Sequence, residues 1–439
     1  MFFLYGIVLT LAFLLLLPRF IYDAIFNGKY ASGFTQRLGY LPPFDRTGGP
    51  VIWVHGVSVG EINAARPLVA GLIREFPGHR LIVSTTTRTG QDLARQVFAG
   101  SVAAVFYFPF DWKFSVRRAL RHFRPSVVLL METEIWFNFL REANKSGARV
   151  AIVNGRLSER SAKRYAYLKQ FMQRVLSYPD LALMQTNADA GRIMGLGMRA
   201  NKVKVTGNLK FDQRSADTNG SVSDDLLERF AFSPDAPLII AASTHAPEEK
   251  QIIEAFRSVW KNSNSSLPRL MIAPRHPERF QAVADEIRKS GFAWARRSEM
   301  ASARDQTAEI ILLDSVGELR AAYPHAEIVF VGGSLIPHGG QSILEPAIEG
   351  KAMITGPFTA NFAAAVDEFL KHDAVIQLSQ TSSENTPKML ADAFTKLLSD
   401  QAYRLTLGEN ARRVMTRNAG AAAKTIELLR PLIAGEAAQ

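Results

Sequence analysis

Short apolar runs rich in β-branched residues alternate with stretches of helical apolar spacing along most of this 439-residue chain. The first such pair is residues 51–55, Val-Ile-Trp-Val-His, followed by residues 62–75, where apolar side chains recur every three or four positions. Strands that alternate with helices form parallel sheets covered on both faces. The alternation therefore predicts an α/β fold.

Two series of strands are expected, and a polar stretch separates them. The first series comprises residues 51–55, 80–84, 103–107, 126–131, 149–154, 181–186 and 203–206, with one uninterrupted helix at 160–176. The second series comprises residues 238–242, 269–273, 309–313, 328–331, 352–355 and 374–377. This pattern predicts two Rossmann-like domains, at 21–212 and 234–400, which face a central cleft. The polar residues 213–233 are the expected linker, and 401–439 the expected C-terminal helices.

The N-terminus carries an apolar run, residues 2–18, at the short end of the length needed to span a bilayer. No basic segment precedes it and no small-residue cleavage site follows, which argues against a removed signal peptide. Arg19, Lys29 and Arg37 come next and favour a cytoplasmic location for the rest of the chain. We expect a membrane anchor at 1–20; a core helix is the alternative, and spanning or entering one leaflet are both open.

Composition narrows the classes of chemistry. The chain has no cysteine, which excludes disulfides, zinc–cysteine sites and thiol catalysis. Its formal net charge of +11 is concentrated, because residues 111–176 hold fourteen Lys or Arg and five Asp or Glu. Such a basic segment indicates a polyanionic partner (nucleic acid or anionic lipid), or a pair of solvated amphipathic helices.

Two candidate reactive groups follow the first strand. The turn Gly56-Val57-Ser58-Val59-Gly60 has the strand–turn–helix context of a hydrolase nucleophile elbow, with Ser58 as nucleophile. Against that interpretation, the turn lies on the first strand of its domain, and no histidine stands in a clear late-strand loop there. Glu61, at the start of the next helix, is the alternative as a general base, or only as a helix-capping residue.

A second acidic motif follows the strand at 126–131. Glu132 and Glu134 are expected at the same sheet edge as Glu61, as an acid–base pair, a stabilising charge or metal ligands. Alternatively, one of them caps the next helix. Lys210, near the end of the first domain, is a candidate for binding an anion, or pairs with Asp212 on the surface.

The second domain places hydroxyls, glycines and basic residues at successive strand ends. Ser243-Thr244-His245 follows its first strand and Arg275 its second. Farther on come Gly332-Gly333-Ser334 and a glycine-rich loop that leads to Glu345. Such groups ahead of helices are typical of a phosphate site. No Asp-x-Asp motif is present, so a metal-bridged sugar diphosphate is not favoured, and we expect a nucleotide held without a metal ion.

Taken together, these motifs resemble those of the Kdo (3-deoxy-D-manno-octulosonate) transferases of lipopolysaccharide assembly. The resemblance covers nearly the whole chain. Its segments are His-Gly-Val-Ser-Val-Gly-Glu61, Met-Glu132-Thr-Glu-Ile-Trp, Gly-Asn-Leu-Lys210-Phe-Asp, Pro-Arg275-His-Pro-Glu-Arg-Phe and Val-Gly-Gly-Ser-Leu with Gly-Gly-x-x-x-Leu-Glu345.

The resemblance implies a GT-B glycosyltransferase with an acceptor domain at 21–212 and a CMP-Kdo domain at 234–400. It implies inverting transfer of Kdo from CMP-Kdo to a lipid A precursor, at an anionic inner-membrane surface, with the catalytic domains cytoplasmic and neither metal nor nucleic acid involved. Glu61 matches the proton acceptor, and Glu132 and Lys210 the stabilisers of the transition state. The positions that match CMP-binding segments are Pro274, Arg275, Val316, Gly317, Glu318, Ser342, Ile343, Leu344 and Glu345.

The sequence departs from the family pattern at two places. Gly56 stands where serine is frequent, and Gln341-Ser342 stand where the family often has His-Asn. The second departure lies inside the nucleotide loop, so it bears on the side-chain contacts expected there and less on Glu345.

Overall fold

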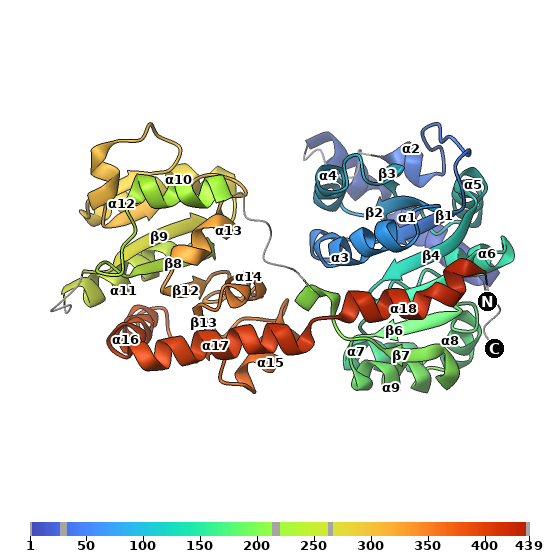
Figure 1. Ribbon diagram of the computed structural model, residues 1–439. Coiled ribbons are helices and arrows are strands. Elements are labelled where there is room, and N and C mark those ends of the chain that lie inside the picture. Colours follow the sequence, from blue (N-terminus) through green and yellow to red (C-terminus); the bar gives the residue numbers. More distant parts are fainter. Residues whose placement is uncertain (1, 27–32, 213–219, 262–266, 436–439) are drawn as a thin grey trace. The chain divides into compact units, whose positions relative to one another are not determined.

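The computed structural model describes residues 2–26, 33–212, 220–261 and 267–435, which form two compact α/β units (Figure 1). Unit 1 comprises Met1–Asp212 and Asn418–Gln439, and unit 2 comprises Gln213–Arg417. Each unit has its own parallel sheet and its own apolar core. The fold class predicted from the alternation is therefore confirmed, with one Rossmann-like sheet in each unit.

Unit 1 is built on a seven-stranded parallel sheet. Its strands are β1 (Val51–His55), β2 (Arg80–Thr85), β3 (Ala104–Tyr107), β4 (Pro125–Met131), β5 (Arg149–Gly155), β6 (Leu181–Met184) and β7 (Val203–Val205). The spatial order is β3-β2-β1-β4-β5-β6-β7, so the chain first moves outward from β1 and then returns to place β4 on its other side. The β1/β4 junction is thus the topological switch point, where open α/β sheets bind ligands.

Helices cover both faces of this sheet. They are α2 (Phe34–Arg37), α3 (Val59–Glu75), α4 (Arg88–Val97), α5 (Lys113–Phe123), α6 (Phe137–Lys145), α7 (Glu159–Ala166), α8 (Lys169–Val175), α9 (Asn187–Gly195) and α18 (Ala421–Ala434), with short 3-10 turns η1 (Ala200–Lys202) and η2 (Leu209–Asp212). Apolar residues of α3 and α18 share one core with β1. A Cβ at Gly71 would lie 2.3 Å from Ile426 Cδ1, so the two helices approach closely here and a larger residue would require the Ile426 side chain to shift.

The C-terminal helix is held to unit 1 by a carboxylate. Asp212 accepts hydrogen bonds from the backbone N–H groups of Gly420 and Ala422, at the start of α18. A carboxylate at a helix N-terminus accepts hydrogen bonds from free N–H groups, and its charge interacts favourably with the helix dipole. These hydrogen bonds join the start of α18 to the rest of unit 1.

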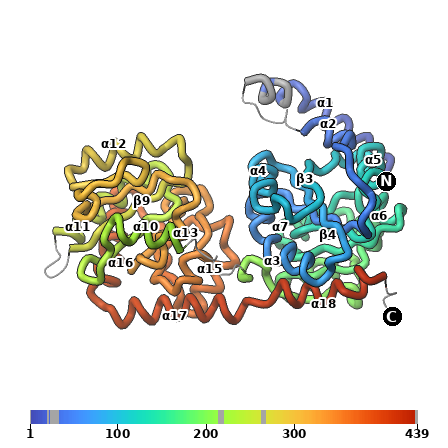
Figure 2. Tube along the Cα trace, turned by 45° about the horizontal axis from the view of Figure 1, so that its top comes forward, coloured from blue at the N-terminus to red at the C-terminus, as the bar shows by residue number. Residues whose placement is uncertain are grey.

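Helix α1 (Phe2–Phe26) is long and apolar enough to cross a membrane, by length and composition, with a mean hydropathy of 2.1 over Phe2–Arg19. One face contacts unit 1: the Phe2 ring lies 5.3 Å from the Phe171 ring, and Tyr5 donates a 2.9 Å hydrogen bond to Asp111. The opposite face exposes large apolar side chains, including Phe3 and Leu15. In Figure 2, α1 (blue) and α18 (red) are the terminal segments of unit 1.

Asp111 has a second structural role. Its carboxylate accepts hydrogen bonds from the backbone N–H groups of Asn138 (3.0 Å) and Phe139 (2.7 Å) in the first turn of α6. Burial raises the pKa of this carboxyl to about 7, although these hydrogen bonds oppose the rise. A single buried carboxylate thus caps α6 and holds α1, a role that its position in the sequence did not reveal.

Unit 2 repeats the architecture with strand order β10-β11-β9-β8-β12-β13-β14. Its strands are β8 (Leu238–Thr244), β9 (Arg269–Pro274), β10 (Trp294–Arg296), β11 (Ile310–Leu312), β12 (Ile328–Val331), β13 (Ala352–Thr355) and β14 (Ile376–Gln377). Its helices are α10 (Gly220–Phe230), α11 (Glu248–Lys261), α12 (Phe280–Ser290), α13 (Leu319–Ala322), α14 (Leu344–Ile348), α15 (Ala363–Leu370), α16 (Thr386–Ser399) and α17 (Gln401–Asn418), with short turns η3 (Pro277–Arg279), η4 (Ala303–Thr307) and η5 (Tyr323–His325). The switch point of this sheet lies between β8 and β12.

The structure differs from the sequence-based expectations in several elements. The predicted helix at 160–176 is two helices, α7 and α8; α8 buries Phe171, Met172 and Val175, whereas α7 buries none of its residues. Within the expected linker 213–233, residues 220–230 form α10; residues 213–219 lie outside the described part. Strand β10 was not expected. The C-terminal helices are divided, with α17 in unit 2 up to Arg417 and α18 in unit 1.

The double role of Asp111 predicts a stability defect. In Asp111→Ala, two N–H groups of α6 lose their acceptor and Tyr5 loses its partner, so the free energy of unfolding should fall by about 1–3 kcal/mol. Denaturant unfolding of the full chain in detergent measures this change. Asp92→Ala is the control, because Asp92 is exposed and its pair with Arg88 is 4.0 Å long. Equal effects of the two substitutions would contradict the capping role.

Candidate active site

The two predicted acidic motifs lie on both sides of the switch point of unit 1. Glu61 lies in the first turn of α3, directly after β1, and Glu132 directly follows β4. Because β1 and β4 are neighbouring parallel strands, both motifs stand at one edge of the sheet. Helix α3 begins at Val59, earlier than the predicted residue 62, and Ser58 is its N-cap residue.

Glu61 is a buried carboxylate with an unusual proton affinity. Its side chain accepts hydrogen bonds from the Val57 N–H (2.9 Å) and from the Ser58 hydroxyl (3.1 Å). Burial raises its pKa to about 7; the Val57 hydrogen bond opposes this rise, and the charges of Glu132 and Glu134 add to it. A carboxylate with a pKa near neutrality is suited to accept a proton at physiological pH.

Ser58 is not hydrogen-bonded to a histidine among the described residues, as a serine nucleophile of a hydrolase would require. The Ser58 hydroxyl donates to Glu61, and the histidine nearest in the sequence, His55, is fully buried with Nδ1 near the Ser84 backbone oxygen (3.1 Å). The ring of His55 stacks on Phe108 at a centroid distance of 3.8 Å, and burial lowers its pKa to about 3. Ser58 therefore orients Glu61 from the N-cap position of α3, where its backbone oxygen accepts the Ile62 N–H at 3.0 Å.

Glu132 forms an ion pair with Lys210. The Lys210 Nζ lies 3.2 Å from Glu132 Oε1, and about a fifth to a quarter of each side chain is exposed. Glu132 has a φ of 54°, a left-handed conformation that is strained for a residue other than glycine. This pairing answers the alternative left open for Lys210, because Asp212 contacts the start of α18 instead.

Two asparagines fix the backbone that carries Lys210, and sequence reasoning did not identify them. Asn154 is the last residue but one of β5 and has a φ of 54°. Its Oδ1 accepts a 2.9 Å hydrogen bond from the Leu209 N–H. Asn208 accepts a 3.0 Å hydrogen bond from the Lys210 N–H. The signal available in the sequence was an asparagine at a strand end, a residue type that tolerates left-handed backbone.

Neither acidic residue of the second motif caps α6, because Asp111 does so. Glu134 is instead a further charge at the site. Burial raises its pKa, and the charge of Glu132 contributes to the rise. The site thus gathers three carboxylates and one ammonium, an arrangement that accepts a proton at Glu61 and presents a cation at Lys210.

The switch point of unit 2 already holds an internal carboxyl group, which corrects part of the expected phosphate site. Glu248, fully buried at the start of α11, accepts four backbone hydrogen bonds of 2.7–2.9 Å. The donors are the N–H groups of His245, Gly333, Ser334 and Leu335. The amides that follow β8 and β12 are therefore already satisfied, and a phosphate would need other groups.

Residues predicted for the nucleotide lie in loops after β9, β11 and β12 of the same unit. Arg275 follows β9 with an exposed side chain, and its backbone N–H donates to the Thr244 oxygen (3.0 Å). Glu318 accepts bonds from Arg297 Nε (2.8 Å) and Nη2 (3.0 Å), and this arginine holds the pKa of Glu318 below its usual range.

The remaining predicted residues of unit 2 divide by exposure. Val316 is 79% exposed, and Gly317 has a φ of 93°, which favours glycine. Where the segment after β12 enters α14, Ile343 and Leu344 are buried, while Ser342 and Glu345 are half-buried. The two polar residues are thus partly exposed, whereas Ile343 and Leu344 belong to the core. Pro274 is the buried last residue of β9.

Among the described residues, no group of three or more His, Asp or Glu side chains is arranged to hold a metal ion. Metal-independent chemistry stays a prediction from the sequence.

Comparisons with known proteins converge on one family. Residues 32–213 match a family model described as 3-deoxy-D-manno-octulosonic-acid transferase. The chain is 34% identical over 405 residues to the 3-deoxy-D-manno-octulosonic acid transferase of Haemophilus influenzae, with 92% of each chain covered. It is 31% identical over 383 residues to the enzyme of the same name from Bordetella pertussis, with 86% of each covered.

Solved structures of low sequence identity support the fold. A glycosyltransferase from Rickettsia africae aligns with a TM-score of 0.57 at 11% identity, covering 88% of this chain and 99% of that one. UDP-GlcNAc 2-epimerase from Neisseria meningitidis aligns with a TM-score of 0.59 at 14% identity, covering 87% and 99%. Two α/β units of the GT-B class are thus the fold of this chain.

The raised pKa of Glu61 predicts a pH-dependent effect on stability. Between pH 4.5 and 7 the unfolded chain ionises this carboxyl while the folded chain keeps it protonated, so stability falls as pH rises. Glu61→Gln cannot ionise and should exceed the wild type by about 2–3 kcal/mol above pH 7, with little advantage near pH 4. Unfolding free energies measured across this range provide the test; a parallel pH dependence of the two proteins would contradict the buried carboxyl.

Proposed function

The chain belongs to the Kdo transferase family of glycosyltransferases, and we propose that it transfers Kdo from CMP-Kdo to a hydroxyl of a lipid A precursor (lipid IVA). The transfer inverts the anomeric carbon and releases CMP. The observation that carries this proposal is the environment of Glu61, a buried carboxylate with a pKa of about 7 at the switch point of unit 1.

In the proposed reaction Glu61 acts as general base. Its carboxylate takes the proton of the acceptor hydroxyl as the hydroxyl oxygen forms a bond to the anomeric carbon of Kdo. The bond from that carbon to the phosphate oxygen breaks, and the electron pair leaves with CMP. The hydrogen bonds from Val57 and Ser58 hold the carboxylate in one orientation before the substrate arrives.

Glu132 and Lys210 stabilise the transition state as a pair in this proposal. Negative charge moves to the phosphate of CMP, and the sugar acid carries its own carboxylate. Lys210 is the cation that this reaction requires, and Glu132 holds its ammonium group at 3.2 Å. The negative charge of Glu132 also raises the pKa of Glu61 and so strengthens the base.

The donor belongs to unit 2 in this proposal. Arg275 supports it, because its guanidinium is exposed and makes no ion pair within the described ranges. The loop from Ser342 to Glu345 offers a hydroxyl and a carboxylate to the ribose hydroxyls of the cytidine. Val316, Gly317 and Glu318 complete the proposed CMP site, which we expect to function without a metal ion.

Membrane attachment through α1 fits a lipid acceptor. The helix exposes apolar side chains along one face while its other face contacts unit 1. We propose that this exposed face enters the cytoplasmic side of the inner membrane, so that unit 1 stays at the lipid surface.

The direct test measures CMP release and product mass after incubation with CMP-Kdo and lipid IVA. Loss of the base in Glu61→Gln should lower kcat by about 100-fold or more. Ser58→Ala removes one hydrogen bond to that base and should cost less than about tenfold. If Ser58→Ala abolishes transfer while Glu61→Gln retains it, the assignment of the base is wrong.

The charge pair at Glu132 and Lys210 predicts opposite shifts of the pH–rate profile. The acidic limb of kcat/KM should follow Glu61, with an apparent pKa of about 7. Lys210→Met leaves the Glu132 charge uncompensated and should move this limb upward by about one unit, whereas Glu132→Gln should move it downward. Shifts of the same sign in both variants would contradict the coupling.

A further inference from the structure

We infer that Arg160 and Arg164 of α7 form a clamp for a phosphate group of the acceptor glycolipid, a subsite that orients the acceptor hydroxyl toward Glu61. This inference rests on the proposed function, since it names the chemistry by which the same reaction recognises its acceptor.

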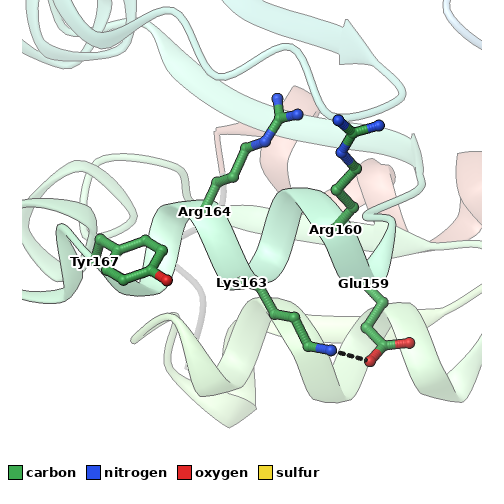
Figure 3. Close-up of a pocket in the computed structure, with 5 residues that line it drawn as sticks. All are labelled: Glu159, Arg160, Lys163, Arg164 and Tyr167. Atoms are coloured by element: carbon green, nitrogen blue, oxygen red, sulfur yellow. Dashed lines mark ion pairs between the residues drawn. The ribbon is translucent and has the colours of Figure 1, made fainter.

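The first observation is the arrangement of charges around α7. Arg160, Lys163, Arg164 and Tyr167 line a surface pocket together with Glu159 (Figure 3). Lys163 pairs with Glu159 at 2.7 Å on one side of the helix. Figure 3 shows the guanidinium groups of Arg160 and Arg164 on the other side.

The two guanidinium groups are suited to share one anion. Arg160 and Arg164 are four residues apart, so their side chains are neighbours on one face of the helix. Both side chains are exposed, and neither forms an ion pair with any residue that the structure describes. Paired arginines bind phosphate through several charge-assisted hydrogen bonds, which a carboxylate-rich or neutral surface does not offer.

The second observation is that α7 is tied to the acidic motif of the site. The Thr133 hydroxyl donates to the Arg156 backbone oxygen and accepts a 2.9 Å hydrogen bond from the Arg156 N–H. Thr133 follows Glu132 directly, and Arg156 lies just before α7. Farther along the helix, the charge of Glu134 helps burial to raise the pKa of Tyr165. The base of α7 and one of its faces thus lie beside the strand end that carries Glu132.

The third observation is that the start of α1 contacts the helix that follows α7. Helix α8, which follows α7, packs its Phe171 against Phe2 of α1 and against Phe137 of α6. Between the two helices, Tyr167 is 90% exposed and Leu168 is 50% exposed. An acceptor with acyl chains beside α1 and a sugar hydroxyl at Glu61 would therefore pass its polar headgroup by α7.

The test compares acceptors that differ only in phosphate. The variant R160Q/R164Q is assayed in neutral detergent micelles with lipid IVA and with the same glycolipid after removal of its phosphates. We expect the KM for lipid IVA to rise by about 10- to 100-fold, with kcat and the KM for CMP-Kdo changed by less than about twofold. With the dephosphorylated acceptor, wild type and variant should have equal KM values.

A matched control separates a clamp from general electrostatic attraction. K145Q/K169Q removes the same charge from α6 and α8 of this unit, outside the pocket lining, and keeps both arginines; it should leave the KM for lipid IVA nearly unchanged. An equal rise in this control, or an equal rise with the dephosphorylated acceptor, would overturn the inference. A further assay presents lipid IVA in phosphatidylglycerol vesicles. If R160Q/R164Q raises the KM only in these vesicles and not in micelles, the pair binds bulk membrane lipid and the inference is also overturned.

A binding measurement keeps this inference separate from the proposed reaction. Full-length wild type in micelles should bind lipid IVA more tightly than its dephosphorylated form, and R160Q/R164Q should abolish the difference. If this preference is found but CMP-Kdo yields no product, the proposed reaction fails and the phosphate clamp stands. If wild type shows no preference for phosphate, the clamp is wrong whatever the activity.

Discussion

The parallel pairing of β1 with β4 is the constraint on which the site of unit 1 depends. In register, His55 lies opposite Leu130, so both strands end at nearly the same level of the sheet. The chain then enters α3 through Glu61 on one strand and turns through Glu132 on the other. Because β1 and β4 are separated by two other strands in the sequence, the sheet topology alone brings these carboxylates to one place.

Burial and charge act against each other at Glu61, and the balance creates its reactivity. Removal from water raises the pKa of the carboxyl, and the charges of Glu132 and Glu134 raise it further. The hydrogen bonds from Val57 and Ser58 favour the ionised form and keep it accessible near neutral pH. Lys210 pairs with Glu132 and so limits the negative charge that the site holds. Burial therefore makes Glu61 a stronger base than an exposed glutamate. The same burial makes the folded chain less stable above pH 7, where this carboxyl ionises.

The sequence predicted the fold class and the positions of most strands, because buried parallel strands are continuous apolar runs. It also brought forward Glu61 and Glu132, which follow β1 and β4, and Lys210, which lies in η2 after β7. It did not reveal that Asp111 caps α6, that Asn154 holds the Lys210 loop, or that Glu248 occupies the amides after β8 and β12. Each of these is a hydrogen bond between residues far apart in the chain, which periodicity does not record. The break between α7 and α8 was missed for a related reason, since no glycine or proline marks it.

The most direct test of this account is the pKa of Glu61 itself, measured by carbon-13 NMR of the full chain labelled at glutamate side-chain carboxyls, with Glu61→Gln to assign the signal. Glu61 should titrate near pH 7, as expected for a buried carboxyl that serves as the base in Kdo transfer. A Glu61 that titrates near 4.5, the ordinary value for glutamate, would contradict it.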